Sequence, residues 1–204
     1  PAGLLLNPGA VNVTVVNPGP VTSAPATFTV GAAPTITTIA PVAVTAGAPT
    51  FNLLVNGAGF NATSVIRLAG QALVTTFLSP TQLSTLITPT LIPIAGSVSI
   101  TVVNSGPVSS NAVSLVINQP AQFVTSTLNT GLIGVPYTQA VNLAGGTPPF
   151  LFAFASGTFP PGLSLNGATG AITGIPTTSG LYDFPLQVTD ASGFVVPKVY
   201  TLVV

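Results

Sequence analysis

Four side chains carry every formal charge in this 204-residue sequence: Arg67, Asp183, Asp190 and Lys198. The sequence has no His, Cys or Glu, so it lacks most groups that exchange protons near neutral pH or hold metals. Ser and Thr hydroxyls are plentiful, but only the two Asp and Lys198 could activate one as a nucleophile. We therefore expect no enzyme, no catalytic residue and no cofactor-binding residue.

Asp190 lies in the segment Val188-Thr189-Asp190-Ala191-Ser192-Gly193, which is typical of a strand that ends in a turn. Asp side chains in such turns accept hydrogen bonds from nearby backbone N–H groups, and we favour this role. The weaker alternative is a calcium site formed by Asp190 with Asp183. Calcium takes six to eight oxygen ligands, normally from several carboxylates, and Asp183 is the one other acid available.

The two cations have simple surface interpretations. Lys198 precedes the final apolar segment, where a solvated charge at a sheet edge deters pairing with other strands. A covalent crosslink of Lys198 near Asp183 or Asp190 is the minor alternative. Arg67 lies between Ile66 and Leu68, so strand alternation turns it away from their core face. We expect a surface residue that pairs with an acid of a neighbour.

Four phenylalanines and two glycosylation patterns complete the candidates. Phe150, Phe152 and Phe154 share one strand parity, which with Phe159 favours core packing over a sugar-stacking platform. Asn12-Val13-Thr14 and Asn61-Ala62-Thr63 fit the N-glycosylation pattern, and exposed Ser and Thr could carry O-glycans. We keep possible glycans as a hypothesis.

Composition restricts the partners. The chain is 47% hydrophobic and 2% charged, with a mean hydropathy of +0.76, whereas about a quarter of an ordinary domain is charged. One Arg and one Lys cannot form the basic surface that nucleic acids require. The longest apolar run, residues 150–155, is far shorter than the roughly 20 residues of a membrane-spanning helix. A surface with so little charge offers little electrostatic resistance to self-association.

The hydrophobic pattern predicts strands. In Val98-Ser99-Ile100-Thr101-Val102, aliphatic and hydroxyl side chains alternate, and Val11-Asn12-Val13-Thr14-Val15 does the same. Alternation bounded by Gly, Pro and Asn indicates strands that are half buried in a β-sandwich. Thr81 to Thr85 is the one place where a short helical turn could form.

The sequence also repeats. Thr14-Val15-Val16-Asn17 returns 87 residues later as Thr101-Val102-Val103-Asn104, and Gly9 corresponds to Gly96. We predict three parts, at residues 1–31, 32–118 and 119–204, the first being the end of a sandwich. The linkers Gly31-Ala32-Ala33 and Asn118-Gln119-Pro120 are short, which favours tandem sandwiches in an extended rod.

The middle part resembles the IPT/TIG immunoglobulin-like family. The motifs are Pro34-Thr35-Ile36-Thr37-Thr38-Ile39-Ala40-Pro41, Val55-Asn56-Gly57-Ala58-Gly59-Phe60, Thr81-Gln82-Leu83, and Thr101-Val102-Val103-Asn104 with Gly106. Through the repeat, the resemblance extends to residues 1–31. It implies an immunoglobulin-like β-sandwich at 32–118.

The last part resembles the putative-Ig (cadherin-like, He-PIG type) family. Its motifs are Gly134-Val135-Pro136-Tyr137, Gly145-Gly146-Thr147-Pro148-Pro149-Phe150, Pro160-Pro161-Gly162-Leu163-Ser164-Leu165, Thr169-Gly170-Ala171-Ile172-Thr173-Gly174-Ile175-Pro176-Thr177 and Val188-Thr189-Asp190. The resemblance implies a spacer, stalk or fibre component of a long secreted or surface protein, with no shared catalytic residues. The sequence departs from the family at Phe159, where Leu is usual.

Together these features predict an extracellular or cell-surface, bacterial structural protein: a self-associating component of a fibre, filament or sheath. Its partners would be copies of itself, through head-to-tail or lateral β-edge contacts. The alternative is an adhesin stalk or a spacer or binding module of a larger protein. The strands of residues 1–31 could be completed by preceding residues of a longer chain, which we favour, or by a neighbouring subunit.

Overall fold

The computed structural model describes residues 9–19, 21–105 and 108–204. Within these residues the regular elements are strands and one short 3-10 helix, η2 (Pro89–Leu91), which confirms the all-β prediction. The prediction of a helical turn at 81–85 is wrong, because residues 82–87 form a strand that pairs with a neighbouring strand. Two compact units are present: residues 1–40, 53–85 and 99–113, and residues 41–52, 86–98 and 114–204.

No helix among the described residues has the length and apolar character needed to cross a lipid bilayer.

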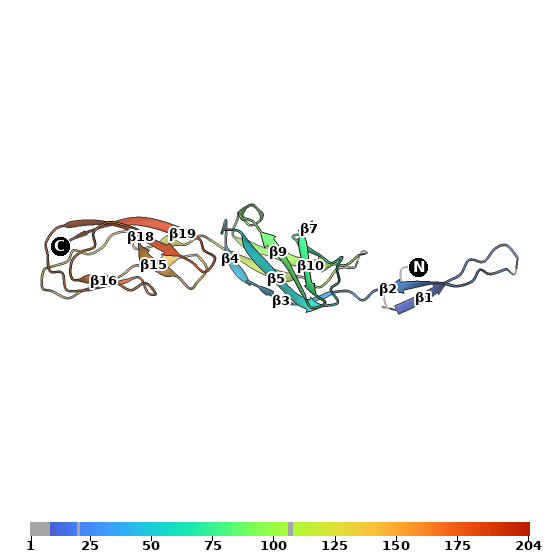
Figure 1. The fold of residues 1–204 in the computed structure, drawn as a ribbon. Helices are drawn as coiled ribbons and strands as arrows, with labels where there is room; N and C mark the ends of the chain where they lie inside the picture. The colour runs from blue at the N-terminus through green and yellow to red at the C-terminus, as the bar shows by residue number, and fades with distance from the viewer. Residues whose placement is uncertain (1–8, 20, 106–107) are drawn as a thin grey trace. The chain divides into compact units, whose positions relative to one another are not determined.

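The first strands, β1 (Gly9–Val13) and β2 (Ala26–Val30), form an antiparallel pair (Figure 1). Their counterparts, 87 residues later, are β10 (Gly96–Val103) and β11 (Val113–Asn118). The isolated bridge Val16↔Thr22 is likewise repeated as Val103↔Ser109. The loops between the strands also match, because Ser23 and Ser110 each accept a bond from the backbone N–H eight residues earlier. Within the described residues, the strand pair and its loop hydrogen bonds thus repeat as the sequence does.

The two copies of this hairpin differ in burial. Val13, Val15 and Phe28 are 52%, 63% and 52% exposed, whereas the equivalent residues of the second copy are all 0% exposed. The equivalent pairs are Val13 and Ile100, Val15 and Val102, and Phe28 and Leu115. The second copy lies in a larger sheet, while β1 and β2 form a two-stranded sheet of their own. The half-buried alternation predicted for residues 11–15 is therefore absent in the described structure.

Strands β3 to β11 form two sheets. One has the order β3-β5-β9-β8 and the other the order β4-β11-β10-β6-β7. The remaining bounds are β3 (Thr35–Ala40), β4 (Ala43–Thr45), β5 (Phe51–Ala58), β6 (Val65–Leu68), β7 (Gln71–Ala72), β8 (Thr75–Ser79) and β9 (Gln82–Ile87). Most pairs with a described register are antiparallel, but β4 and β11 are parallel, with Val44 opposite Ile117.

The segment Val55-Asn56-Gly57-Ala58-Gly59-Phe60 owes its residue types to a close approach of β3. A Cβ atom on Gly57 would lie 1.9 Å from the carbonyl oxygen of Thr35, so this position excludes any side chain. Asn56 donates from Nδ2 to Thr38 Oγ1 and accepts at Oδ1 from Gln82, which links β3, β5 and β9. Phe60 is buried beside this crossing. The residues of this motif thus serve the close packing of β3 against β5.

The C-terminal strands form three small sheets, ordered β12-β14, β13-β17-β16 and β15-β18-β19. Their bounds are β12 (Gln122–Phe123), β13 (Tyr137–Ala140), β14 (Leu143–Ala144), β15 (Leu151–Phe154), β16 (Leu163–Leu165), β17 (Ala171–Gly174), β18 (Leu181–Thr189) and β19 (Val195–Val203). They enclose one hydrophobic core. Its fully buried members include Phe184, Leu186, Val188 and Leu202, at alternate positions of β18 and β19. Period-two alternation therefore places one face of each of these two strands in the core.

The motif at 160–165 meets the motif at 169–177 through a glycine. A Cβ atom on Gly162, whose φ is +89°, would lie 2.0 Å from the carbonyl oxygen of Ile175. Two backbone bonds join the segments: Ile175 N donates to Gly162 O, and Thr177 N donates to Pro161 O, both at 3.0 Å. These paired turns hold the end of β17 beside the start of β16.

Candidate functional site: the buried Asp190 network

Asp190 directly follows β18, and its carboxylate is buried, with the residue 5% exposed. Oδ1 accepts hydrogen bonds from the backbone N–H groups of Ser192 at 2.9 Å and Phe194 at 3.0 Å. This is the turn-capping role that the sequence predicted. Oδ2 accepts two further bonds, from the backbone N–H of Thr147 at 3.1 Å and from the hydroxyl of Thr45. Four donors thus replace the water that burial removes from this carboxylate.

The hydroxyl protons in this network have one consistent order. Thr45 gives its single hydroxyl proton to Asp190, because an ionised carboxylate can only accept. The bond between the Thr45 and Thr147 hydroxyls, at 2.9 Å, must then be donated by Thr147. Thr147 Oγ1 in turn accepts from Asn118 Nδ2 at 3.0 Å. A directed chain therefore runs from Asn118 through Thr147 and Thr45 to Asp190.

Thr45 comes from β4, far from the other members in sequence. It is fully buried, and its backbone N–H donates to Ser192 Oγ at 2.9 Å. Sequence reasoning found Asp190 but missed Thr45 and the role of Thr147. Thr147 carried a signal, since it belongs to the 145–150 motif, whereas nothing local distinguishes Thr45 from the many other threonines. No buried side-chain nitrogen or oxygen in the described part of the chain lacks a hydrogen-bond partner.

Asp183 lies elsewhere on β18, on the exposed face of its sheet, where it accepts a bond from Thr201 Oγ1 at 2.5 Å. Asp183 is thus exposed on the strand, whereas Asp190 is buried just beyond its end. Among the described residues, no three His, Cys, Asp or Glu side chains gather as metal ligands would. The calcium hypothesis for Asp190 and Asp183 stays a prediction.

Lys198 is half buried, unlike the solvated edge charge that we expected. Its Nζ donates to the carbonyl oxygen of Thr125 at 2.6 Å and lies 4.8 Å from the centre of the Tyr200 ring. Tyr200 donates its hydroxyl to the same carbonyl at 2.7 Å. Burial raises the pKa of Tyr200 to about 12, and burial also raises the pKa of Tyr137. Arg67, by contrast, is exposed between buried Ile66 and Leu68, as alternation predicted.

The aromatic residues pack inward, as expected for a core. Phe152 is buried, and Phe150, Phe154 and Phe159 pack half buried against the same cluster. Phe154 and Phe159 lie 5.7 Å and 5.1 Å from Phe184, each in an edge-to-face arrangement. Such pairs gain energy beyond area burial, and their faces are covered by one another. The platform needed to stack a sugar is therefore missing from these four residues.

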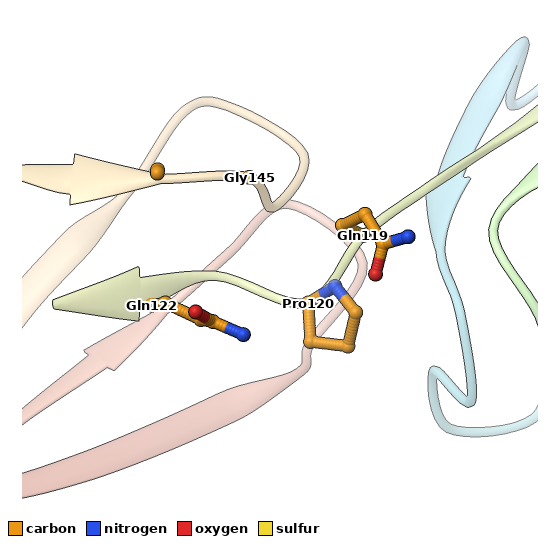
Figure 2. Close-up of a pocket in the computed structure, with 5 residues that line it drawn as sticks. Gln119, Pro120, Gln122 and Gly145 are labelled. Atoms are coloured by element: carbon orange, nitrogen blue, oxygen red, sulfur yellow. The ribbon is translucent and has the colours of Figure 1, made fainter. Parts of the chain in front are cut away.

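A shallow hollow of about 340 Å³ lies at the start of the C-terminal strands (Figure 2). Gln119, Pro120, Gln122, Ala144 and Gly145 line it, and beside them the backbone N–H of Gly146 donates to Gln119 O. Its polar groups are two side-chain amides and backbone atoms. These groups can form hydrogen bonds, but none can transfer a proton or act as a nucleophile.

Comparison with known proteins identifies the domain type. Residues 73–204 match the family described as "Putative Ig domain". The chain belongs to this family. The match covers more than half of the chain and begins at Leu73, well before the motifs of the last part. In this putative Ig domain the paired turns at Gly162 lie within the matched residues, as do all members of the Asp190 network except Thr45. No curated protein matches the sequence.

Similar solved structures include a putative alpha-galactosidase from Bacteroides fragilis NCTC 9343. It is 23% identical, with a TM-score of 0.37, and the match covers 41% of this chain and 17% of that one. The C-terminal fragment of intimin, solved with the intimin-binding domain of the translocated intimin receptor, is 12% identical, with a TM-score of 0.42, 82% of this chain covered and 63% of that one. The Yersinia pseudotuberculosis adhesin InvE is 12% identical, with a TM-score of 0.29, over 81% and 58% of the chains. This chain spans less than two thirds of the length of each of these structures.

Proposed function

We propose that this chain is a structural segment of an extracellular, bacterial fibre, filament or surface sheath whose tandem immunoglobulin-like sandwiches associate with copies of themselves. In this proposal residues 32–118 form an IPT/TIG-like sandwich, residues 1–31 the end of another, and residues 119–204 the putative Ig domain. The observation that carries the proposal is a surface rich in exposed aliphatic side chains and almost without charge.

Large apolar side chains are exposed in both units. Val74 is 92% exposed and Ile94 75% exposed, and further exposed valines and leucines lie on β18 and β19. A soluble domain normally prevents association with charged side chains and a net charge, but this chain has two cations, two acids and a net charge of zero. Burying apolar area between copies is therefore favourable, and no net repulsion opposes it.

The repeated hairpin also supports a tandem array. Its first copy keeps the strand pairing and loop hydrogen bonds of the second but exposes the side chains that the second copy buries. We propose that further strands of the same kind cover this face. Whether they come from the same polypeptide or from a neighbouring copy stays open, and either arrangement joins sandwiches into a series.

A second candidate function is an adhesin stalk or a spacer of a larger surface protein. The Asp190 network favours it, because the bonds from Thr45 and Asn118 to the loops around Thr147 and Asp190 limit local motion. A stalk must be rigid to hold other domains away from the surface, and hydrogen bonds between distant segments add to its rigidity. In this case the chain would stay monomeric, and binding or catalysis would belong to other domains.

Sedimentation and electron microscopy of the purified chain separate the two functions. For the fibre component we expect filaments or sheets above a critical concentration, in acid, at neutral pH and in 1 M salt. Strictly monodisperse single molecules at millimolar concentration would refute self-association and favour the stalk. Intact-mass measurement of native material tests the proposed glycans, since a mass equal to that of the bare polypeptide excludes them.

A further inference from the structure

The outer face of the sheet β15-β18-β19 is apolar around one carboxylate. Strand pairing places Leu181 opposite Val203, Asp183 opposite Thr201 and Pro185 opposite Val199, with all six side chains on the side away from Phe184 and Leu186. Leu181, Val199 and Val203 are strongly exposed. We call this surface the Asp183 face; its residues are Leu181, Asp183, Pro185, Val199, Thr201 and Val203.

Asp183 is held in place on this face but still has acceptor capacity. A carboxylate offers about four lone-pair sites. Within the described residues, the Thr201 hydroxyl uses one of them, at Oδ1. The apolar neighbours would shield an ion pair at this point from water once another molecule covered them, which strengthens the attraction between opposite charges.

A second sheet face carries one exposed cation among small side chains. On the first unit, Arg67 of β6 lies between Thr101 of β10 and Ala72 of β7, and Val65 lies opposite Val103. Arg67 Nη1 donates to Gly70 O at 3.3 Å, one of five N–H groups that a guanidinium can use. We call this surface the Arg67 face; its residues are Val65, Arg67, Ala72, Thr101 and Val103.

The four charges of the chain differ in availability. Asp190 is buried and accepts four hydrogen bonds, and Lys198 is half buried against Thr125 O and the Tyr200 ring. Asp183 and Arg67 are exposed, with opposite charges, and each lies on a sheet face among small or apolar side chains. The two faces therefore carry opposite charges, and both are otherwise formed mainly by small or apolar side chains.

We infer that the Asp183 face of one copy packs against the Arg67 face of a second copy, with the Arg67 guanidinium paired to the Asp183 carboxylate. This contact rests on the proposed self-association and specifies its surfaces. Two sheets can pack face to face in this way, about 10 Å apart. The apolar side chains supply most of the attraction, and the ion pair fixes which surfaces meet and in which register.

The contact is heterologous, because the two faces belong to different parts of the chain. Each bound copy therefore keeps one Arg67 face or one Asp183 face available for the next copy. A contact of this kind that does not close into a ring produces a filament. One kind of junction is thus sufficient for continued growth.

Charge reversal tests the pairing. In Arg67→Asp two acids meet at the junction, and in Asp183→Arg two cations meet. Each variant alone should raise the critical concentration for assembly about tenfold or more in low salt. The reason is that it both removes the attraction of the natural ion pair and adds repulsion between like charges across the interface. An equimolar mixture of the two variants restores opposite charges at every junction. It should assemble, in alternation, within about twofold of the natural critical concentration.

Thr138→Asp and Thr138→Arg are matched controls, because they introduce the same charged side chains at an exposed position of β13, which belongs to a different sheet from both faces. Their critical concentrations should equal that of the natural chain. If either reversal unfolds the protein, Arg67→Gln and Asp183→Asn test the same pair and should weaken assembly to a smaller degree.

The outcomes separate this inference from the proposed function. Reversed variants that assemble like the natural chain, or that fail alone and also fail together, overturn the Arg67–Asp183 contact while filaments of the natural chain uphold the proposed function. A natural chain that never assembles overturns both.

Discussion

Replacing Asp190 by Asn removes one charge from the buried network while keeping the shape of the side chain. Oδ1 can still accept from Ser192 and Phe194, but the amide nitrogen now faces the donating N–H of Thr147, and the Thr45 hydroxyl loses a charged acceptor. Bonds to charged groups contribute about 1.5–3 kcal/mol each, and a buried donor left unpaired costs a further 1–3 kcal/mol. We expect the free energy of unfolding to fall by about 2–3 kcal/mol, which lowers Tm by roughly 4–12 °C in a protein of this size.

A double-mutant cycle with Thr45→Val tests whether the network acts as a unit. Valine matches threonine in size but cannot donate, so this change alone should cost about 1–2 kcal/mol. Because both changes remove the same bond, the double variant should lose about 1 kcal/mol less than the sum of the single losses. Thr138→Val, at an exposed position of β13, is the control and should change stability by less than about 0.5 kcal/mol.

Urea unfolding followed by circular dichroism measures all four variants. Losses for Asp190→Asn and Thr45→Val that add within about 0.5 kcal/mol would show that the two residues act independently, and would refute the directed chain of hydrogen bonds.

Three further predictions concern packing, pH and salt. Gly57→Ala should lower the free energy of unfolding by at least about 2 kcal/mol, because the added carbon meets Thr35 O; Gly31→Ala, with open space around it, should be neutral in the same urea titration. Burial raises the pKa of Tyr200 from 10 to about 12, so its neutral form stabilises the fold fully below pH 10 and this stability is lost as pH rises through 12. We expect the free energy of unfolding from urea titrations to fall over that range by up to roughly 2 kcal/mol, and to fall less in Tyr200→Phe; an unchanged free energy of unfolding at pH 12 would contradict the assigned burial. Raising salt from 0.05 to 1 M should change the critical concentration of the natural chain, measured by light scattering, by less than about threefold, because apolar contacts dominate the assembly. Assemblies that dissolve in 1 M salt would contradict the dominance of apolar contacts.

The sequence was sufficient for the features that depend on local pattern. Alternation at Ile100 and Val102 predicted buried faces, and the spacing of 87 residues predicted that residues 1–31 contain the strands that end the middle part; both copies form a hairpin with the same loop bonds. The turn role of Asp190 followed from the residues next to it. Each of these depends on neighbours within a few positions or on simple repetition.

What the sequence left open depends on contacts between distant segments. Thr45 reaches Asp190 across 145 positions, and no local property marks it among the other threonines. Lys198 was expected in solvent because Lys is usually exposed, but Thr125 and Tyr200, brought together by the fold, hold it half buried. The 81–85 segment was ambiguous because its run of polar and apolar residues is short, and pairing with β8 decided in favour of a strand.

The parallel pairing of β4 and β11 has a mechanical consequence. Val116 N donates to Val42 O, and Ala46 N donates to Asn118 O, so bonds occur at both ends of the pair. Tension that pulls the chain upstream of Pro41 and downstream of Asn118 in opposite directions slides these strands along each other instead of peeling them apart. All the bonds of the pair are then loaded together, and this segment should resist stretching more strongly than an antiparallel hairpin pulled open from its free ends.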